Sequence, residues 1–123
     1  MSIGSGDGQR RIRDAASRLG VDIGPAATEM FAVHARELLR WNQKINLTAI
    51  TDPAAVAVKH FVDAVAALRV LPPGGHLLDI GSGAGFPGIP LKIARPALVV
   101  TLVDAARRKV SFLNHLIRTL ALE

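Results

Sequence analysis

The segment LLDIGSGAGFPG, at positions 77–88, constrains the fold of this chain more than any other feature. An apolar run ends there in an acid, Asp79. Three glycines follow at alternate positions, and these are Gly81, Gly83 and Gly85. Because glycine has no Cβ, the backbone can adopt positive φ and a ligand can approach the main chain closely. The pattern predicts a strand that runs into a loop able to hold a cofactor.

Two prolines come directly after the glycines. Pro87 and Pro90 fit the first turn of a helix, where a missing N–H costs nothing, so we expect the loop to end at a helix N-terminus with free N–H donors. Strand, glycine loop and helix then follow each other in the order of a nucleotide-binding fold. The alternative is a glycine-rich turn between a strand and a helix that binds no ligand.

A second acid closes the next predicted strand. Residues 98–103 are apolar and rich in β-branched side chains, and Asp104 follows them directly. Asp104 lies 19 residues after Gly85, close to the spacing of about 20 residues at which an acid reaches a ribose hydroxyl in βαβ nucleotide sites. We therefore expect Asp104 to bind a ribose diol. The alternative role, which is compatible with the first, is to cap the helix from Ala105 onward.

The glycine spacing also separates two classes of cofactor. A dinucleotide fingerprint reads G-x-G-x-x-G, and Phe86 occupies its third glycine position, counted from Gly81. This weakens the case for NAD or FAD, although a nucleotide-dependent oxidoreductase stays an alternative. Asp79 begins the order D-I-G-S-G-A-G, which resembles the first motif of Rossmann-like methyltransferases and favours S-adenosylmethionine. A carboxylate at this strand end can hold the N–H groups of the loop or a cationic ammonium.

Composition excludes several other classes of protein. The chain has no cysteine, which rules out disulfides, thiolate metal sites and cysteine nucleophiles. Its four histidines are too scattered for a zinc motif, and we expect no metal. No apolar stretch approaches the roughly 20 residues of a membrane span, and the N-terminus lacks the apolar core of a signal peptide. We therefore expect a soluble cytoplasmic protein.

The net charge of +5 is concentrated late in the chain. Positions 105–122 carry four basic residues and no acid, a distribution that would attract a polyanion such as RNA. The alternative is a solvated helix face. The four basic residues are Arg107, Arg108, Lys109 and Arg118.

Apolar residues recur at helical spacing ahead of the glycine segment. One helix there carries a single apolar stripe. We interpret His34 as part of this stripe and not as a ligand. Asp52 and Pro53 form an N-cap and N1 pair for the helix that follows. The stripe consists of Phe31, His34, Leu38 and Trp41, and the predicted helices are 9–19, 25–41, 53 to before 72, 87–95 and 105–120.

A cluster of prolines and glycines at positions 72–75 divides the chain. We expect an N-terminal helical region over residues 1–71, followed over residues 72–123 by the start of a Rossmann-like βαβα domain. The last helix should turn one apolar side towards the sheet. That side consists of Val110, Leu113, Leu116, Ile117 and Leu120.

With these pieces in place, the chain resembles the RsmG family, also called GidB. These bacterial enzymes use S-adenosylmethionine to methylate guanine N7 in 16S ribosomal RNA. The segment G-F-P-G-I-P is the most specific part of the resemblance, because most related methyltransferases lack its prolines. The resemblance rests on Trp41, Asn42, Asn46, Leu47 and Thr48 in WNQKINLT, on Lys59, His60 and Asp63 in KHFVDA, on residues 79–93, and on Asp104 with Arg108, Lys109, Phe112 and Leu113.

The resemblance implies an α/β protein with a Rossmann-like class I methyltransferase fold, preceded by a helical cap. It implies S-adenosylmethionine as the cofactor and 16S ribosomal RNA or the small ribosomal subunit as the partner. We further expect a monomer that acts without metal or membrane, and no catalytic residue can be assigned. The expected cofactor-binding residues are Asp79, Gly81, Ser82, Gly83, Gly85, Phe86 and Asp104. The expected RNA-binding residues are Lys59, His60, Arg107, Arg108 and Lys109.

Two alternatives accompany this interpretation. Lys59, His60 and Asp63 would either contact RNA or buttress the cofactor loop, and for Asp63 the alternative is a structural capping role. Proteins of the family continue beyond the second strand into a seven-stranded sheet, so we expect this chain to correspond to the first part of such a domain. The alternative function is therefore a truncated, non-catalytic remnant of the family that binds the cofactor or RNA.

Overall fold

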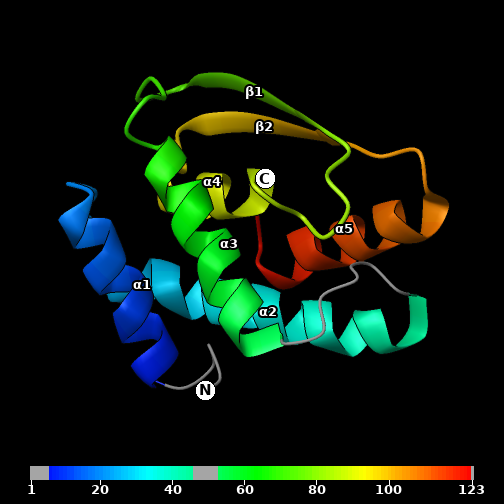
Figure 1. The fold of residues 1–123 in the computed structure, drawn as a ribbon. Helices are drawn as coiled ribbons and strands as arrows, with labels where there is room; N and C mark the ends of the chain where they lie inside the picture. Colours follow the sequence, from blue (N-terminus) through cyan, green and yellow to red (C-terminus); the bar gives the residue numbers. More distant parts are fainter. Residues whose placement is uncertain (1–5, 46–52, 123) are drawn as a thin grey trace.

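A computed structural model of the chain describes residues 6–45 and 53–122 (Figure 1). The predicted residues Asn46, Leu47, Thr48 and Asp52 lie outside this part of the chain. The elements follow in the order α1 (Gly6–Arg18), α2 (Pro25–Ile45), α3 (Pro53–Ala67), β1 (Gly75–Ile80), α4 (Gly88–Ala94), β2 (Leu98–Val103) and α5 (Arg107–Thr119).

The predicted elements are all present, with shifted ends. Helix α1 ends where Gly20 was expected to end it, because Gly20 adopts a φ of +76°. The N–H groups of Gly20 and Val21 then donate back to carbonyls of the last turn, at 3.0 and 2.9 Å. Helix α2 runs on past Trp41 to Ile45, and α3 begins at Pro53 as predicted.

Strands β1 and β2 form a two-stranded parallel sheet. Parallel neighbours need a crossover connection, and α4 supplies it. The register pairs Asp79 with Leu102 and Ile80 with Val103, so both strands end at the same edge. The glycine loop follows β1 at this edge and Asp104 follows β2 there, which places Asp104 against the glycine loop.

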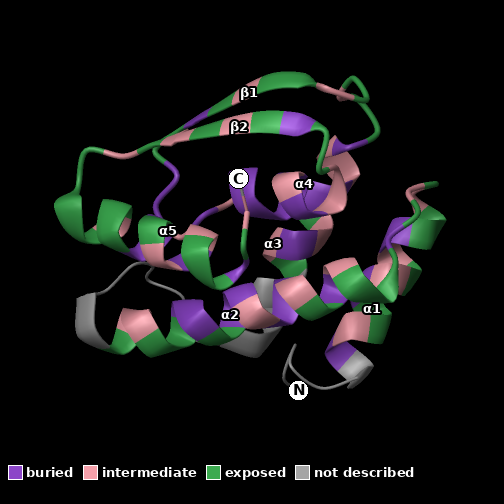
Figure 2. Cartoon of the chain, turned by 180° about the vertical axis from the view of Figure 1, so that it is seen from behind, coloured by how far each residue is buried: buried purple, intermediate pink, exposed green. Residues whose placement is uncertain are grey.

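The two faces of the sheet differ in their surroundings. One face packs on α4, which contains five buried residues. The other face is open, and the exposed fraction of Ile80 reaches 76%. In Figure 2 most residues of β1 and β2 are coloured as exposed or intermediate, whereas most residues of α4 are buried. The apolar side chains exposed on the open face are Leu78, Ile80, Val99 and Val103.

One hydrophobic core joins the helices to the sheet. It includes Phe31 of α2, Phe61 of α3 and Phe112 of α5, all fully buried. The predicted stripe on α2 is confirmed, because Phe31, His34 and Leu38 are buried and Trp41 packs against the core. The core contains residues from both sides of positions 72–75, and the division of the chain at residue 72 stays a prediction.

The predicted apolar side of α5 is confirmed only in part. Leu113, Leu116 and Leu120 are buried, but Val110 is exposed. The reason is that α5 begins beyond the end of β2 and also packs on α2, where Trp41 lies against Phe112 with ring centroids 5.6 Å apart. Phe112 lies outside the predicted side and is fully buried.

Across residues 6–45 and 53–122, every helix is too short or too polar to serve as a membrane span.

Candidate functional site

The glycine loop adopts the backbone conformation that its sequence predicts. Gly81, Gly83 and Gly85 have φ values of +76°, +49° and +93°. The loop is also tied to the end of β2, because the N–H groups of Gly81 and Ser82 donate to the Val103 carbonyl at 2.7 and 3.1 Å. A further bond of 2.7 Å, from Gly85 N to the Ser82 carbonyl, closes the turn. The loop is therefore a fixed part of the sheet edge.

Asp79 holds this loop against the start of α4. Its side chain is buried, and Oδ2 accepts the N–H of Gly88 at 3.1 Å. The Ser82 hydroxyl donates to the Asp79 main-chain carbonyl at 2.9 Å. The Asp79 carboxylate therefore binds one N–H of the protein, at the first residue of α4 rather than in the loop. Its part in binding the cofactor stays a prediction.

The expected free donors at the start of α4 are not found. Gly88 N is taken by Asp79, and Ile89 N donates to the Gly85 carbonyl at 2.9 Å. Pro90 has no N–H to offer. The prediction was wrong because the acid before the loop folds back onto the helix that follows it.

Gly88 was missed as a structural residue of this site. A Cβ at Gly88 would overlap the Leu102 side chain and would lie 2.9 Å from Asp79 Oδ2. Only glycine lets α4 approach both strands this closely. The signal in the sequence was the glycine directly after Pro87, in the first turn of the predicted helix.

Asp104 connects the glycine loop to α5. Its Oδ2 accepts the N–H of Gly83 and its Oδ1 accepts the N–H of Ala106, both at 2.9 Å. The N–H of Ala106 does most to lower the pKa of Asp104. Desolvation is the next largest influence and opposes this shift, whereas the Gly83 N–H and the charge of Lys109 add to it. The carboxylate is thus ionised at neutral pH, and each oxygen keeps room for a second hydrogen bond.

The expected alternative role of Asp104 as the cap of a helix from Ala105 onward is not found, because α5 begins at Arg107 and its N-cap residue is Ala106. Asp104 instead binds the N–H of Ala106 in the turn before α5. The ribose role stays a prediction.

Phe86 turns towards the helices. Its ring stacks on His34, with centroids 4.6 Å apart, and on His60, at 5.0 Å. Phe61 also contacts Phe86, in an edge-to-face arrangement with ring centroids 5.0 Å apart. Of the two roles left open for His60, contact with RNA or support of the loop, its position against Phe86 favours support.

His34 reaches the glycine loop from α2. Its ring is fully buried, and Nε2 lies 2.8 Å from the Ala84 carbonyl oxygen. Burial lowers the pKa of His34 to about 4, and the hydrogen bond to Ala84 opposes this only in part. The ring is therefore neutral at pH 7. Since a carbonyl can only accept, Nε2 carries the proton, and the buried Nδ1 has no hydrogen-bond partner among the described residues.

The predicted RNA-binding residues fall into separate places. Arg107 and Arg108 are exposed in the first turn of α5, and Lys59 is exposed on α3. Lys109 is partly buried and lies beside the loop, since a Cβ at Gly83 would be 4.0 Å from both Lys109 Cδ and Asp104 Oδ2. Lys109 thus belongs to the surroundings of Asp104.

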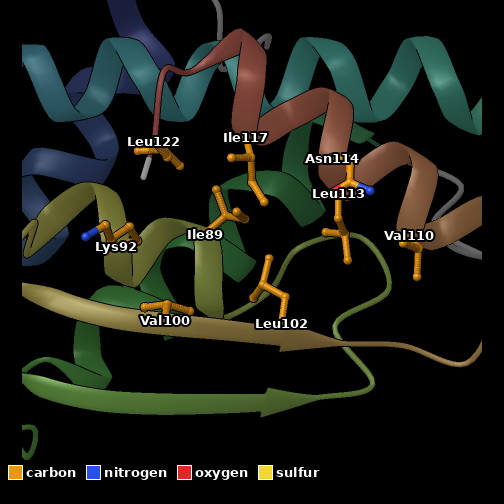
Figure 3. A pocket seen from close by; sticks show the side chains of 9 residues that line it. All are labelled: Ile89, Lys92, Val100, Leu102, Val110, Leu113, Asn114, Ile117 and Leu122. Atoms are coloured by element: carbon orange, nitrogen blue, oxygen red, sulfur yellow. The ribbon is translucent and has the colours of Figure 1, made fainter.

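A cavity of about 120 Å³ lies between α4, β2 and α5 (Figure 3). Its wall is mainly apolar, and Leu102 and Ile89 point into it. The ammonium of Lys92 donates to the carbonyls of Pro96 and Leu98, both at 2.7 Å. The lining residues are Ile89, Lys92, Val100, Leu102, Val110, Leu113, Asn114, Ile117 and Leu122.

No metal centre is evident within the described ranges, since they hold no group of three or more His, Cys, Asp or Glu placed to bind an ion.

Two parallel strands joined by a helix, a glycine loop after the first strand and an acid after the second define a Rossmann-like α/β fold of the cofactor-binding class.

Comparison with known proteins gives the family. The sequence model described as rRNA small subunit methyltransferase G (GidB) matches residues 27–123. The chain is 45% identical over 113 residues to the ribosomal RNA small subunit methyltransferase G of Desulforamulus reducens. It is 49% identical over 107 residues to that of Geobacter metallireducens. These matches cover 90% and 87% of this chain, but 47% and 49% of the relatives. The chain belongs to the rRNA small subunit methyltransferase G family, and it spans about half the length of the curated relatives it matches.

Proposed function

We propose that this chain binds S-adenosylmethionine at the glycine loop and that the protein transfers its methyl group to guanine N7 of 16S ribosomal RNA. The observation that carries the proposal is the 2.9 Å hydrogen bond from Gly83 N to Asp104 Oδ2. It joins the loop that would meet the cofactor's methionine part to the acid that would bind its ribose. Membership of the family supports the reaction and the substrate.

The described residues fit the proposed cofactor. A Cβ at Gly81 would meet no atom within 4 Å, so the main chain there is open to a ligand. Asp104 remains able to accept from two ribose hydroxyls beside its two backbone donors. In this proposal Gly81 and Gly83 contact the cofactor, whereas Asp79, Ser82, Gly85 and Phe86 fix the conformation of the loop from its inner side.

The chemistry requires orientation above all. S-adenosylmethionine, when bound, supplies an electrophilic methyl group. Guanine N7 is an unprotonated acceptor on the major-groove edge of the base, so no side chain has to remove a proton from it. The contribution of Asp104 and the loop is to fix the ribose and the methionine part. Alignment of this kind supplies roughly 7–11 kcal/mol in well-oriented systems.

The RNA would approach over the first turn of α5. Arg107 and Arg108 are exposed there, one and two residues beyond Ala106, whose N–H binds Asp104, so that their charges lie near the proposed cofactor. Guanidinium groups bind phosphates in a fixed fork geometry. We propose that these two residues contact the substrate RNA, free or in the small ribosomal subunit, and that the protein acts where ribosomes are assembled, in the cytoplasm.

Titration calorimetry with S-adenosylmethionine tests the cofactor, with NAD as the competing ligand. We expect binding of S-adenosylmethionine near one to one, and no heat with NAD. Preference for NAD would favour an oxidoreductase and overturn the proposal. Transfer of a labelled methyl group to small ribosomal subunits then tests the reaction. Cofactor binding without transfer would support the alternative of a binding protein that does not catalyse.

A further inference from the structure

His34 is the one fully buried titratable side chain of the described residues that reaches the glycine loop from the helices. It lies on α2, 50 residues before Ala84, whose carbonyl it binds at 2.8 Å. Ala84 lies between Gly83, whose N–H binds the Asp104 carboxylate, and Gly85, whose N–H binds the Ser82 carbonyl. The His34 side chain therefore contacts the central residue of the glycine loop in the proposed cofactor site.

The loop is also built tightly against the His34 ring. A Cβ at Gly85 would lie 3.1 Å from His34 Nε2, closer than side chains normally pack. The ring stacks on Phe86 at an interplanar angle of 18°. His34 thus contacts three consecutive loop residues, through the Ala84 carbonyl, the Gly85 main chain and the Phe86 ring.

Asp104 and His34 hold opposite groups of this loop. Asp104 accepts an N–H donated by Gly83, and His34 donates an N–H to the carbonyl of the next residue. One donor and one acceptor of adjacent residues are thereby both fixed by side chains from distant elements. The Ala84 carbonyl is partly buried, and loss of its partner would cost free energy, so the His34 contact restricts the conformations that the loop can adopt.

We propose that His34 is a positioning residue of the cofactor site, which holds residues 83–85 in the conformation that receives S-adenosylmethionine. This inference rests on the proposed function for its ligand. It gives the N-terminal helices a part in cofactor binding, because α2 carries the donor. His34 itself does not contact the cofactor and acts through the Ala84 carbonyl.

The test compares three variants by calorimetry with S-adenosylmethionine and by thermal unfolding. His34→Phe keeps a ring for Phe86 but loses the donor, and His34→Gln keeps an N–H donor. Phe31→Leu, on the same helix, is the matched control, because Phe31 stacks on Phe61. We expect His34→Phe to weaken binding about three- to tenfold, the scale of one neutral hydrogen bond. His34→Gln should recover part of this loss, and Phe31→Leu should lose thermal stability with affinity within about twofold of wild type. Equal affinity in His34→Phe and wild type, or an equal loss in Phe31→Leu, would overturn the proposal.

Amide hydrogen exchange without ligand separates this inference from the proposed function. The reporters are the N–H groups of Gly83 and Gly85, which are hydrogen-bonded in the loop. We expect both to exchange faster in His34→Phe than in wild type, and to be unchanged in Phe31→Leu. If wild type does not bind S-adenosylmethionine, the proposed function fails while this comparison still decides whether His34 sets the loop. Unchanged exchange in His34→Phe would contradict the positioning role at any affinity.

Discussion

The two sides of the glycine loop have opposite surroundings. On the inner side, Asp79, His34 and Gly88 are buried, and each is in tight contact with the loop or with α4. On the outer side, Asp104 is partly exposed and keeps acceptor capacity, and Arg107 is exposed. Residues of the same chemical type therefore have different roles here. The buried carboxylate stabilises the fold, and the accessible one is available to a ligand.

This contrast predicts where substitutions act. Changes on the inner side should cost free energy of unfolding, because they leave buried groups without partners or force atoms to overlap. Changes on the outer side should cost affinity with little loss of stability.

The largest expected effect is a pH dependence due to His34. Its pKa is about 4 in the folded chain, against 6.5 for an ordinary histidine. Between these values the unfolded chain binds a proton that the folded chain does not, so stability falls as the pH is lowered from 6.5. The slope is about 1.4 kcal/mol per pH unit and the whole effect about 3 kcal/mol. Urea unfolding of wild type and His34→Phe from pH 4 to pH 8 measures it. Parallel pH profiles in the two proteins would contradict a neutral, buried His34.

The next effect in size is expected at Gly88. In Gly88→Ala the new methyl group overlaps Leu102 and approaches Asp79 Oδ2, so α4 must move away from the strands. Overpacking of this kind costs about 1–3 kcal/mol. The matched control is Gly74→Ala, whose Cβ would meet no atom closer than 3.8 Å. Denaturation midpoints of the two variants should differ clearly, and equal midpoints would show that the inner side is not tightly packed.

On the outer side, Asp104→Asn should weaken S-adenosylmethionine binding about tenfold or more, the scale of a charge-assisted hydrogen bond. The fold should lose less, since the amide oxygen can still accept one of the two backbone N–H groups. Calorimetry with a parallel melting curve checks both. An unaltered dissociation constant would remove Asp104 from the cofactor site, and a collapse of the fold would place it with the inner side.

The smallest expected change concerns Arg107 and Arg108. Replacing both by glutamine should weaken RNA binding severalfold and reduce the slope of log affinity against log salt concentration by about one to two units. Arg118→Gln provides the control for loss of a charge on the same helix. If all three replacements leave the slope unchanged, the exposed basic residues of α5 form only a solvated face.

Part of this arrangement follows from local sequence. Three alternating glycines after an apolar run predict the positive φ values, and the apolar run before Asp104 predicts the second strand. The helical spacing of Phe31 and His34 predicts their burial. Each of these features depends on neighbouring residues, which is why patterns in a single sequence can find them.

The contacts that decide the roles of these residues are not local. The bond from His34 to Ala84 joins positions 50 residues apart, and the packing of Gly88 on Leu102 depends on how α4 crosses between the strands. In the sequence, Asp79 and Asp104 each come directly after a run of apolar residues. Only the folded chain shows that one is buried against α4 and the other is accessible.

The most direct test of this account follows backbone amide NMR signals while S-adenosylmethionine is added to the protein. We predict saturable shifts that are largest at Gly81, Gly83 and Ala106, around Asp104, with small shifts at Ala84 and Gly85 on the side held by His34 and none in α1. If the amide signals of Gly81 and Gly83 do not shift, or if only signals elsewhere in the chain shift, the cofactor does not bind on the outer side of the glycine loop.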